Sequence, residues 1–167
     1  MTSSLVIEAF YDPTTFTYSY LLMDSGSLDA AVIDSVWDYD PKSGRTRTES
    51  AERLLERAQA LDANVRWHLE THVHADHLSA AQFLKHATGG LTAISSKVIS
   101  IQTVFGKIFN TEASLAADGS QFDRLLADGE SLPLGAFSID VIPTPGHTPA
   151  CVSYRINDGL VQHIFVG

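Results

Sequence analysis

The stretch Thr71-His72-Val73-His74-Ala75-Asp76-His77 places three imidazoles and a carboxylate side by side in a short segment. Residues two apart on an extended chain point the same way, so His72 and His74 can reach one point from the end of a strand. We expect a helix over 76–87, with Asp76 and His77 at its N-terminus, where the helix dipole favours a carboxylate. Four side chains of this kind are suited to binding one or two divalent metal ions.

The composition is that of a globular chain with an acidic surface. The 167 residues suit one domain over 1–167, and 44% hydrophobic residues are too many for disorder. A net charge of -9 argues against nucleic acid or an anionic membrane as a partner. No apolar run approaches the roughly 18 residues of a membrane span. A single cysteine and the lack of a signal peptide predict a cytoplasmic location.

The hydrophobic pattern predicts strands and helices that alternate along much of the chain. Helical spacing predicts helices over 48–61, 76–87 and 96–109, and a loop is expected around 38–44. The predicted strands are 5–10, 16–23, 30–33, 65–70, 91–94 and 137–142, followed by a hairpin of 151–156 and 160–166. The predicted fold class is α/β with a mixed sheet and outer helices.

A second candidate ligand, His147, lies seventy positions after His77 in the loop Pro143-Thr144-Pro145-Gly146-His147-Thr148-Pro149. The prolines limit the freedom of this loop, and the glycine lets backbone approach closely. A ligand could be held ready in such a loop at little entropic cost. We therefore interpret His147 as a metal ligand supplied by a distant segment.

Other polar residues are expected to have ordinary roles. Asp34 could cap the end of a strand or touch the site. Cys151 is expected to be buried and inert. The remaining histidines, His68, His86 and His163, lack a partner cluster, and the acidic residues Asp123, Asp128 and Glu130 are expected in a solvated turn.

Together, the two motifs resemble the metallo-β-lactamase-fold superfamily. Its first signature, Thr-His-x-His-x-Asp-His, is matched in full by residues 71–77, and its Gly-His turn is matched by Gly146-His147. The flanking segments Phe10-Tyr11-Asp12-Pro13 and Thr148-Pro149-Ala150-Cys151-Val152 look like the persulfide dioxygenase and glyoxalase II-like group. The resemblance implies an αββα sandwich. The family follows the glycine that aligns with Gly167 with a metal-binding Asp, so the domain is expected to be incomplete at its C-terminus and to have little activity alone.

The resemblance implies one of two reactions on a small thiol-derived substrate. A persulfide dioxygenase would use Fe(II), with His72, His147 and the following Asp as ligands and His74, Asp76 and His77 around them, to oxidise glutathione persulfide. A glyoxalase II-type hydrolase would use one or two Zn2+ ions to cleave a thioester, with His72, His74 and His147 on the first ion and Asp76 and His77 on the second. In both, His72, His147 and Asp76 are the expected catalytic residues. A third possibility is a non-catalytic metal-binding or interaction module, with a second copy or a complementary C-terminal segment as its partner.

Overall fold

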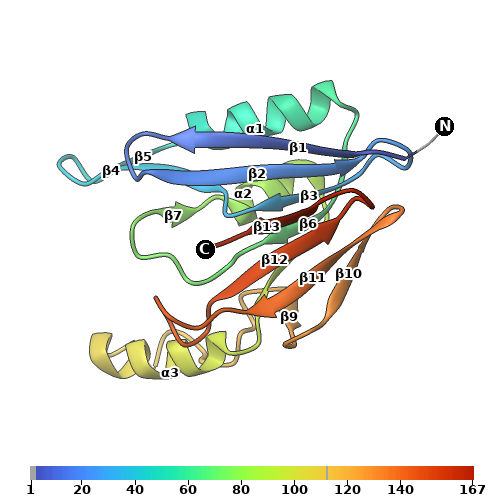
Figure 1. Cartoon of the computed structure of the whole chain (residues 1–167). Coiled ribbons are helices and arrows are strands. Elements are labelled where there is room, and N and C mark those ends of the chain that lie inside the picture. The colour runs from blue at the N-terminus through green and yellow to red at the C-terminus, as the bar shows by residue number, and fades with distance from the viewer. Residues whose placement is uncertain (1–2, 112) are drawn as a thin grey trace.

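The structure is a computed structural model that describes residues 3–111 and 113–167. Within this part of the chain, no helix is long and apolar enough to cross a membrane. The elements, shown in Figure 1, are β1 (Leu5–Asp12), β2 (Thr17–Asp24), β3 (Asp29–Ile33), β4 (Val36–Asp40), β5 (Arg45–Arg47), α1 (Glu49–Ala60), β6 (Asn64–Leu69), β7 (Leu78–Ser79), α2 (Ala81–Thr88), β8 (Leu91–Ser95), α3 (Val98–Phe109), β9 (Arg124–Leu126), β10 (Ser131–Leu134), β11 (Phe137–Pro143), β12 (Val152–Asn157) and β13 (Gln162–Phe165).

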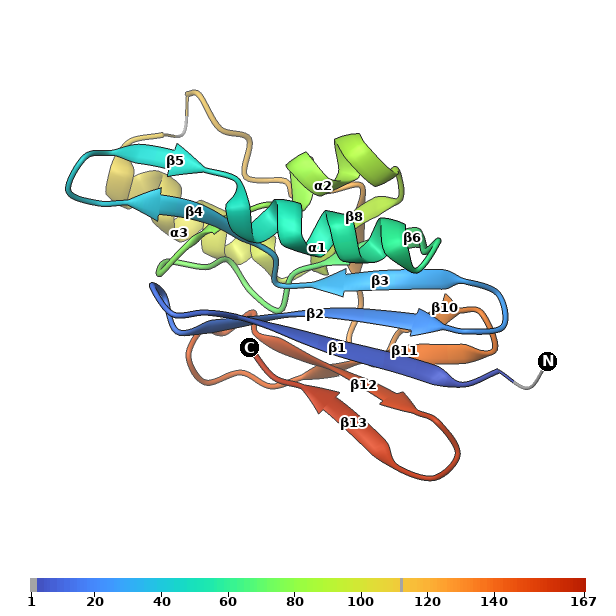
Figure 2. The ribbon, with the colours of Figure 1, turned by 90° about the horizontal axis from the view of Figure 1, so that it is seen from above.

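These strands form two larger sheets and one small sheet. The first has the order β1-β2-β3-β6-β8-β9, antiparallel from β1 to β3 and parallel from β3 to β9. The second, β10-β11-β12-β13, is antiparallel throughout. The small sheet has the order β5-β4-β7. Figure 2 shows α1 and α2 on one side of the first sheet and the second sheet on the other. The predicted mixed sheet with outer helices is confirmed.

The alternation of apolar residues along the central strands builds a core on each face of the first sheet. On β2, Leu22 faces the second sheet, whereas Leu21 and Met23 face the helices. On β3, Ile33 belongs to the cluster between the sheets and Val32 to the cluster under α1. Strands buried on both faces read as continuous apolar runs, which explains why these two were recognisable from the sequence.

The segment after the metal motif does not form the expected helix at Asp76. Helix α2 begins at Ala81, because Leu78–Ser79 pairs with Val36–Trp37 of β4 and the Ala80 N–H donates to Ser35 O at 2.9 Å. These bonds occupy the backbone groups that a first helical turn would need. Asp76 and His77 therefore lie in an irregular loop, and the helix-dipole argument for Asp76 was wrong.

The segment predicted as a loop around 38–44 is largely a hairpin. Strand β4 pairs with β5 in the register Asp38 with Arg47, Tyr39 with Thr46 and Asp40 with Arg45. Strand β5 is polar and exposed throughout, and in β4 the alternation of Trp37 and Tyr39 with two aspartates is too short to stand out as a half-buried strand. The short strands β9 and β10 were also not predicted. Hairpin β4–β5 extends the molecule beside the β1–β2 turn (Figure 1).

The turn into β8 gives a test of close backbone packing. Gly89 and Gly90 both have positive φ, +78° and +79°, but a Cβ at Gly90 would lie 2.5 Å from Val65 O, whereas one at Gly89 would meet nothing within 4 Å. Gly89→Ala carries only conformational strain, about 1–3 kcal/mol, because its φ of 78° and ψ of -151° lie in a region that is essentially restricted to glycine. We expect Gly90→Ala to lower the free energy of unfolding by a further roughly 1–3 kcal/mol, because overpacking against Val65 O is added to the strain of a positive φ. Urea denaturation of both variants measures the difference, and equal losses would contradict the packing argument.

Candidate metal centre

The candidate ligands lie where two neighbouring parallel strands end. Strand β3 leads into Asp34 and strand β6 into Glu70, and the Asp34 N–H donates to Leu69 O at 2.9 Å. The carboxyl ends of parallel strands meet at one edge of a sheet, so these residues and the loop of 71–77 come together. The second sheet joins this loop through the Val152 N–H, which donates to Thr71 O at 3.0 Å.

Asp34 is a buried residue that contacts both Thr71 and His74. Its carboxylate is buried, with 4% of the residue exposed, and accepts hydrogen bonds from the backbone N–H and the hydroxyl of Thr71, both at 2.8 Å. The same carboxylate lies 3.0 Å from His74 Nε2. Its backbone has φ of +50°, a conformation that Asp tolerates better than most residues. Of the two roles considered for Asp34, contact with the site is the one that the structure shows.

The hydrogen bonds of Thr71 fix which nitrogen of His72 is free. The Thr71 hydroxyl has one proton, and it donates this proton to Asp34 Oδ2. It must therefore accept the proton of His72 Nδ1, which lies 2.9 Å away. His72 then carries its proton on Nδ1 and presents an unprotonated Nε2. Burial and the neighbouring His74 lower the pKa of His72 to about 4, so the ring is neutral at pH 7, as a metal ligand must be.

His74 is oriented by two carboxylates. Its Nε2 donates to Asp34 and lies 3.2 Å from Glu70 Oε2, a buried oxygen. Glu70 is held in turn by the hydroxyl of Ser79. Burial lowers the pKa of His74, but its hydrogen bonds with Asp34 and Glu70 outweigh burial and raise the pKa to about 10. His74 therefore carries a proton on both ring nitrogens at pH 7, and it could offer Nδ1 to a metal only by releasing that proton.

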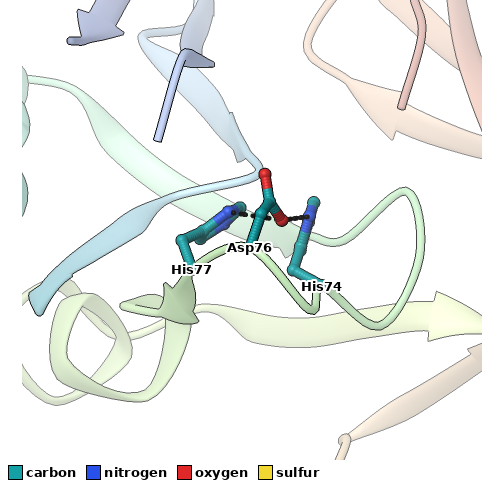
Figure 3. Close-up of side chains that lie close together, drawn as sticks. All are labelled: His74, Asp76 and His77. Atoms are coloured by element: carbon teal, nitrogen blue, oxygen red, sulfur yellow. Dashed lines mark ion pairs between the residues drawn. The ribbon is translucent and has the colours of Figure 1, made fainter. Parts of the chain in front are cut away.

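Asp76 and His77 complete a compact group with His74 (Figure 3). One ligand atom from each of the three residues lies within 4.8 Å of the others. Asp76 Oδ1 lies 3.3 Å from His77 Nδ1 and 3.9 Å from His74 Nδ1, and Asp76 Oδ2 accepts a hydrogen bond from the Thr17 hydroxyl. The Asp76 side chain is about half exposed, whereas the His77 side chain is fully buried.

The surroundings of His77 show whether a metal ion fits at this site. Both of its ring nitrogens are buried, and neither has a hydrogen-bond partner among the residues that the structure describes. Buried polar atoms are almost always paired, so such an orphan calls for a ligand. Burial and the neighbouring His74 lower the pKa of His77, which keeps the ring neutral and able to bind metal. Imidazole and carboxylate donors suit zinc and iron, so the residues fit a metal ion of this class.

His147 approaches the group from the second sheet. Its loop joins β11 to β12 and is tied by the Thr144 N–H, which donates to Cys151 O at 3.0 Å. The centroid of the His147 ring lies 5.0 Å from that of His72, with the rings nearly perpendicular, and the His72 and His74 centroids are 4.1 Å apart. The structure thus brings all five sequence-predicted residues, His72, His74, Asp76, His77 and His147, into one region.

The polar residues that were not expected to belong to the site make local contacts instead. His68 is buried in β6 with Nε2 2.9 Å from Gly89 O, His86 is exposed on α2, and His163 pairs with Asp158. Cys151 is buried, as predicted. Asp123 lies in an exposed bend, as expected, but its carboxylate also accepts the Thr92 N–H and hydroxyl and pairs with Lys85.

Sequence reasoning did not single out Glu70 and Thr71 as supports of the site. Both lie between β6 and His72, and Glu70 is only 3% exposed. A buried Glu next to a histidine motif was the available signal, because a carboxylate is rarely buried without a partner.

The chain belongs to the metallo-beta-lactamase superfamily, whose family model matches residues 13–161. A "Probable metallo-hydrolase" of Burkholderia pseudomallei is 60% identical over 159 residues, 95% of this chain and 54% of that protein. The mitochondrial persulfide dioxygenase ETHE1 of Homo sapiens is 27% identical over 92% of this chain and 49% of its own length. The crystal structure of ETHE1 from Myxococcus xanthus matches with a TM-score of 0.67 and 26% identity, over 90% of this chain and 53% of that one. The chain therefore spans about half the length of these relatives.

Proposed function

We propose that this chain provides the metal centre of a persulfide dioxygenase that oxidises a glutathione-type persulfide to sulfite. The observation that carries the proposal is the pairing of His72 with His147, which come from different sheets and meet with their rings 5.0 Å apart. Gly167 lies against the same ring, since a Cβ there would fall 2.9 Å from His72 Nδ1. The superfamily resemblance implies a carboxylate ligand directly after this position, which would complete a set of two histidines and one carboxylate.

Such a ligand set suits non-haem iron. Two histidines and a carboxylate would hold Fe(II), which would supply the O2-activating chemistry that oxidation of a persulfide needs. The balanced reaction converts R–S–SH, O2 and H2O into the thiol R–SH, sulfite and two protons. The residues of this chain would serve it by holding the candidate ligands in place. Asp34 and Thr71 hold His72 in the tautomer with a free Nε2, and Asp34 and Glu70 hold His74 beside it.

A hydrolase with two metal ions is the second candidate, favoured by a separate observation. The ligand atoms of His74, Asp76 and His77 form their own compact group, and both nitrogens of His77 lack a partner among the described residues. Two zinc ions held by the five residues would lower the pKa of a bound water and polarise a thioester carbonyl. The name of the Burkholderia relative agrees with hydrolysis.

Metal analysis and two substrates separate these functions. We expect a form of the protein extended by the second half of the Burkholderia relative to bind about one iron ion and to consume O2 when glutathione persulfide is added, with sulfite as product. S-lactoylglutathione should remain uncleaved. The matched control is the same fusion with His72→Ala. Thioester cleavage by a zinc-loaded fusion, with no O2 uptake from the iron-loaded one, would overturn the dioxygenase proposal in favour of the hydrolase.

A further inference from the structure

A cavity of about 460 Å³ opens beside the metal centre. The β1–β2 turn, the β4–β5 hairpin and the loop of Ala75–His77 line it. The turn and the hairpin project at the same end of the molecule in both ribbon views (Figures 1 and 2). The volume lies within the range of small-molecule sites, and His77 and Asp76 form one wall. A molecule in this cavity would therefore touch the metal ligands.

The hairpin contributes a cation that is only loosely paired. Among the lining side chains in the described part of the chain, Arg47 carries the one permanent positive charge. Its closest acidic neighbour, Glu49, is 3.7 Å away, and its guanidinium donates no hydrogen bond to a described residue. Its side chain is 67% exposed. A guanidinium with free N–H groups at a cavity wall is suited to binding a carboxylate with two parallel hydrogen bonds.

The remaining charges on the wall are acidic. Asp12, Asp38, Asp40 and Asp76 also line the cavity, so its lining is negative overall. The carboxylates of Asp12 and Asp38 accept hydrogen bonds from the backbone N–H groups of Thr15 and Ser50, respectively. Asp40 lies on the hairpin with Arg47, and its side chain accepts bonds from the Lys42 N–H and the Ser43 hydroxyl. Such a lining disfavours an anionic group that has no cationic partner but accepts an ammonium group.

We propose that this cavity binds the zwitterionic amino-acid end of a thiol-derived substrate, with the carboxylate on Arg47 and the ammonium on the acidic wall at Asp40. A zwitterion is neutral, so the acidic lining does not exclude it, while both of its charges find a partner. Cysteine carries this group next to its sulfur, and glutathione carries it at its γ-glutamyl end. The inference rests on the proposed function, because it assigns the substrate end that lies away from the metal.

Binding of non-reacting thioethers to the 167-residue chain tests the proposal without metal or turnover. NMR titrations would compare S-methylcysteine, S-methylglutathione, 3-(methylthio)propanoate, which has only the carboxylate, and 2-(methylthio)ethylamine, which has only the ammonium. We expect one or both zwitterions to bind, with shifts at the hairpin, and the two singly charged compounds to bind at least several-fold more weakly. Which of the two zwitterions binds more tightly identifies the source of the amino-acid group.

Variants decide whether Arg47 is responsible. Arg47→Ala should weaken binding of the zwitterion roughly tenfold, the size expected for losing a charge-assisted pair of hydrogen bonds. The matched control is Arg66→Ala, which removes an exposed arginine that pairs with Asp29 on the far part of the sheet. Equal affinities of the Arg47 and Arg66 variants, or equal binding of all four thioethers, would overturn the proposal. O2 uptake by the extended protein is measured separately, so a failed pocket and a failed dioxygenase give different results.

Discussion

Replacing His72 or His147 with alanine is expected to abolish iron binding and O2 consumption with glutathione persulfide. Each substitution removes one of only two histidine ligands in the proposed iron site, and the remaining donors cannot hold the ion alone. His74→Ala should reduce metal affinity by roughly 10–100-fold, the usual cost of losing a supporting group. Iron content after gel filtration and oxygen-electrode rates check this order. His86→Ala, on the exposed face of α2, is the control that should change neither quantity.

The same three variants discriminate the two candidate functions. With two zinc ions, His74 would be a direct ligand, and its loss should cost as much metal as the loss of His72. Similar collapse of metal binding in all three variants would therefore argue against the one-iron site. Circular dichroism of each variant separates loss of the ligand from loss of the fold.

Replacing Asp34 with alanine is expected to damage both stability and metal binding. The Thr71 N–H, the Thr71 hydroxyl and His74 Nε2 would lose a buried acceptor together. Leaving such groups unpaired should lower the free energy of unfolding by about 3–5 kcal/mol. His72 would also lose the contact that selects its tautomer, so metal affinity should fall by roughly 10–100-fold.

Asp123 provides a matched control for Asp34. Its carboxylate accepts the N–H and the hydroxyl of Thr92, the same pair of bonds that Asp34 makes with Thr71, but near β9 instead of at the metal centre. Asp123→Ala should destabilise the protein while leaving metal affinity per folded molecule unchanged. Isothermal calorimetry with Zn2+ and urea denaturation measure the two effects. Equal metal affinity in both variants would contradict the positioning role of Asp34.

The spacing of the histidines predicted the candidate ligands because a metal site needs several donors on a short segment, and few other structures use that pattern. Asp34 and Glu70 could not be assigned in the same way. Their meeting depends on β3 and β6 being parallel neighbours, and neither strand's sequence states which strand lies beside it. The backbone hydrogen bond from Val152 to Thr71 could not be predicted from the sequence for the same reason.

Local sequence patterns gave the wrong secondary structure where pairing with a distant strand determined the backbone conformation. Residues 76–80 have acceptable helical composition, yet Leu78 and Ser79 are taken by β4, and the helix begins only at Ala81. The hairpin of β4 and β5 contains Pro41 and Gly44 with many charges, which read as a loop. Strand β5 is exposed along its length, so it needs no apolar residues. This hairpin is also the element that forms the wall of the proposed substrate cavity.

The division of the ligands between two sheets has a further meaning for folding. His72 leaves the first sheet after β6, whereas His147 sits on a loop of the second sheet between β11 and β12. An ion bound by both residues is a cross-link between layers that otherwise adhere mainly through apolar side chains. Binding would stabilise the folded state according to the concentration of free metal, by about 2.7 kcal/mol at one hundred times the dissociation constant. The supply of metal in the cell would thus influence how much of the protein stays folded.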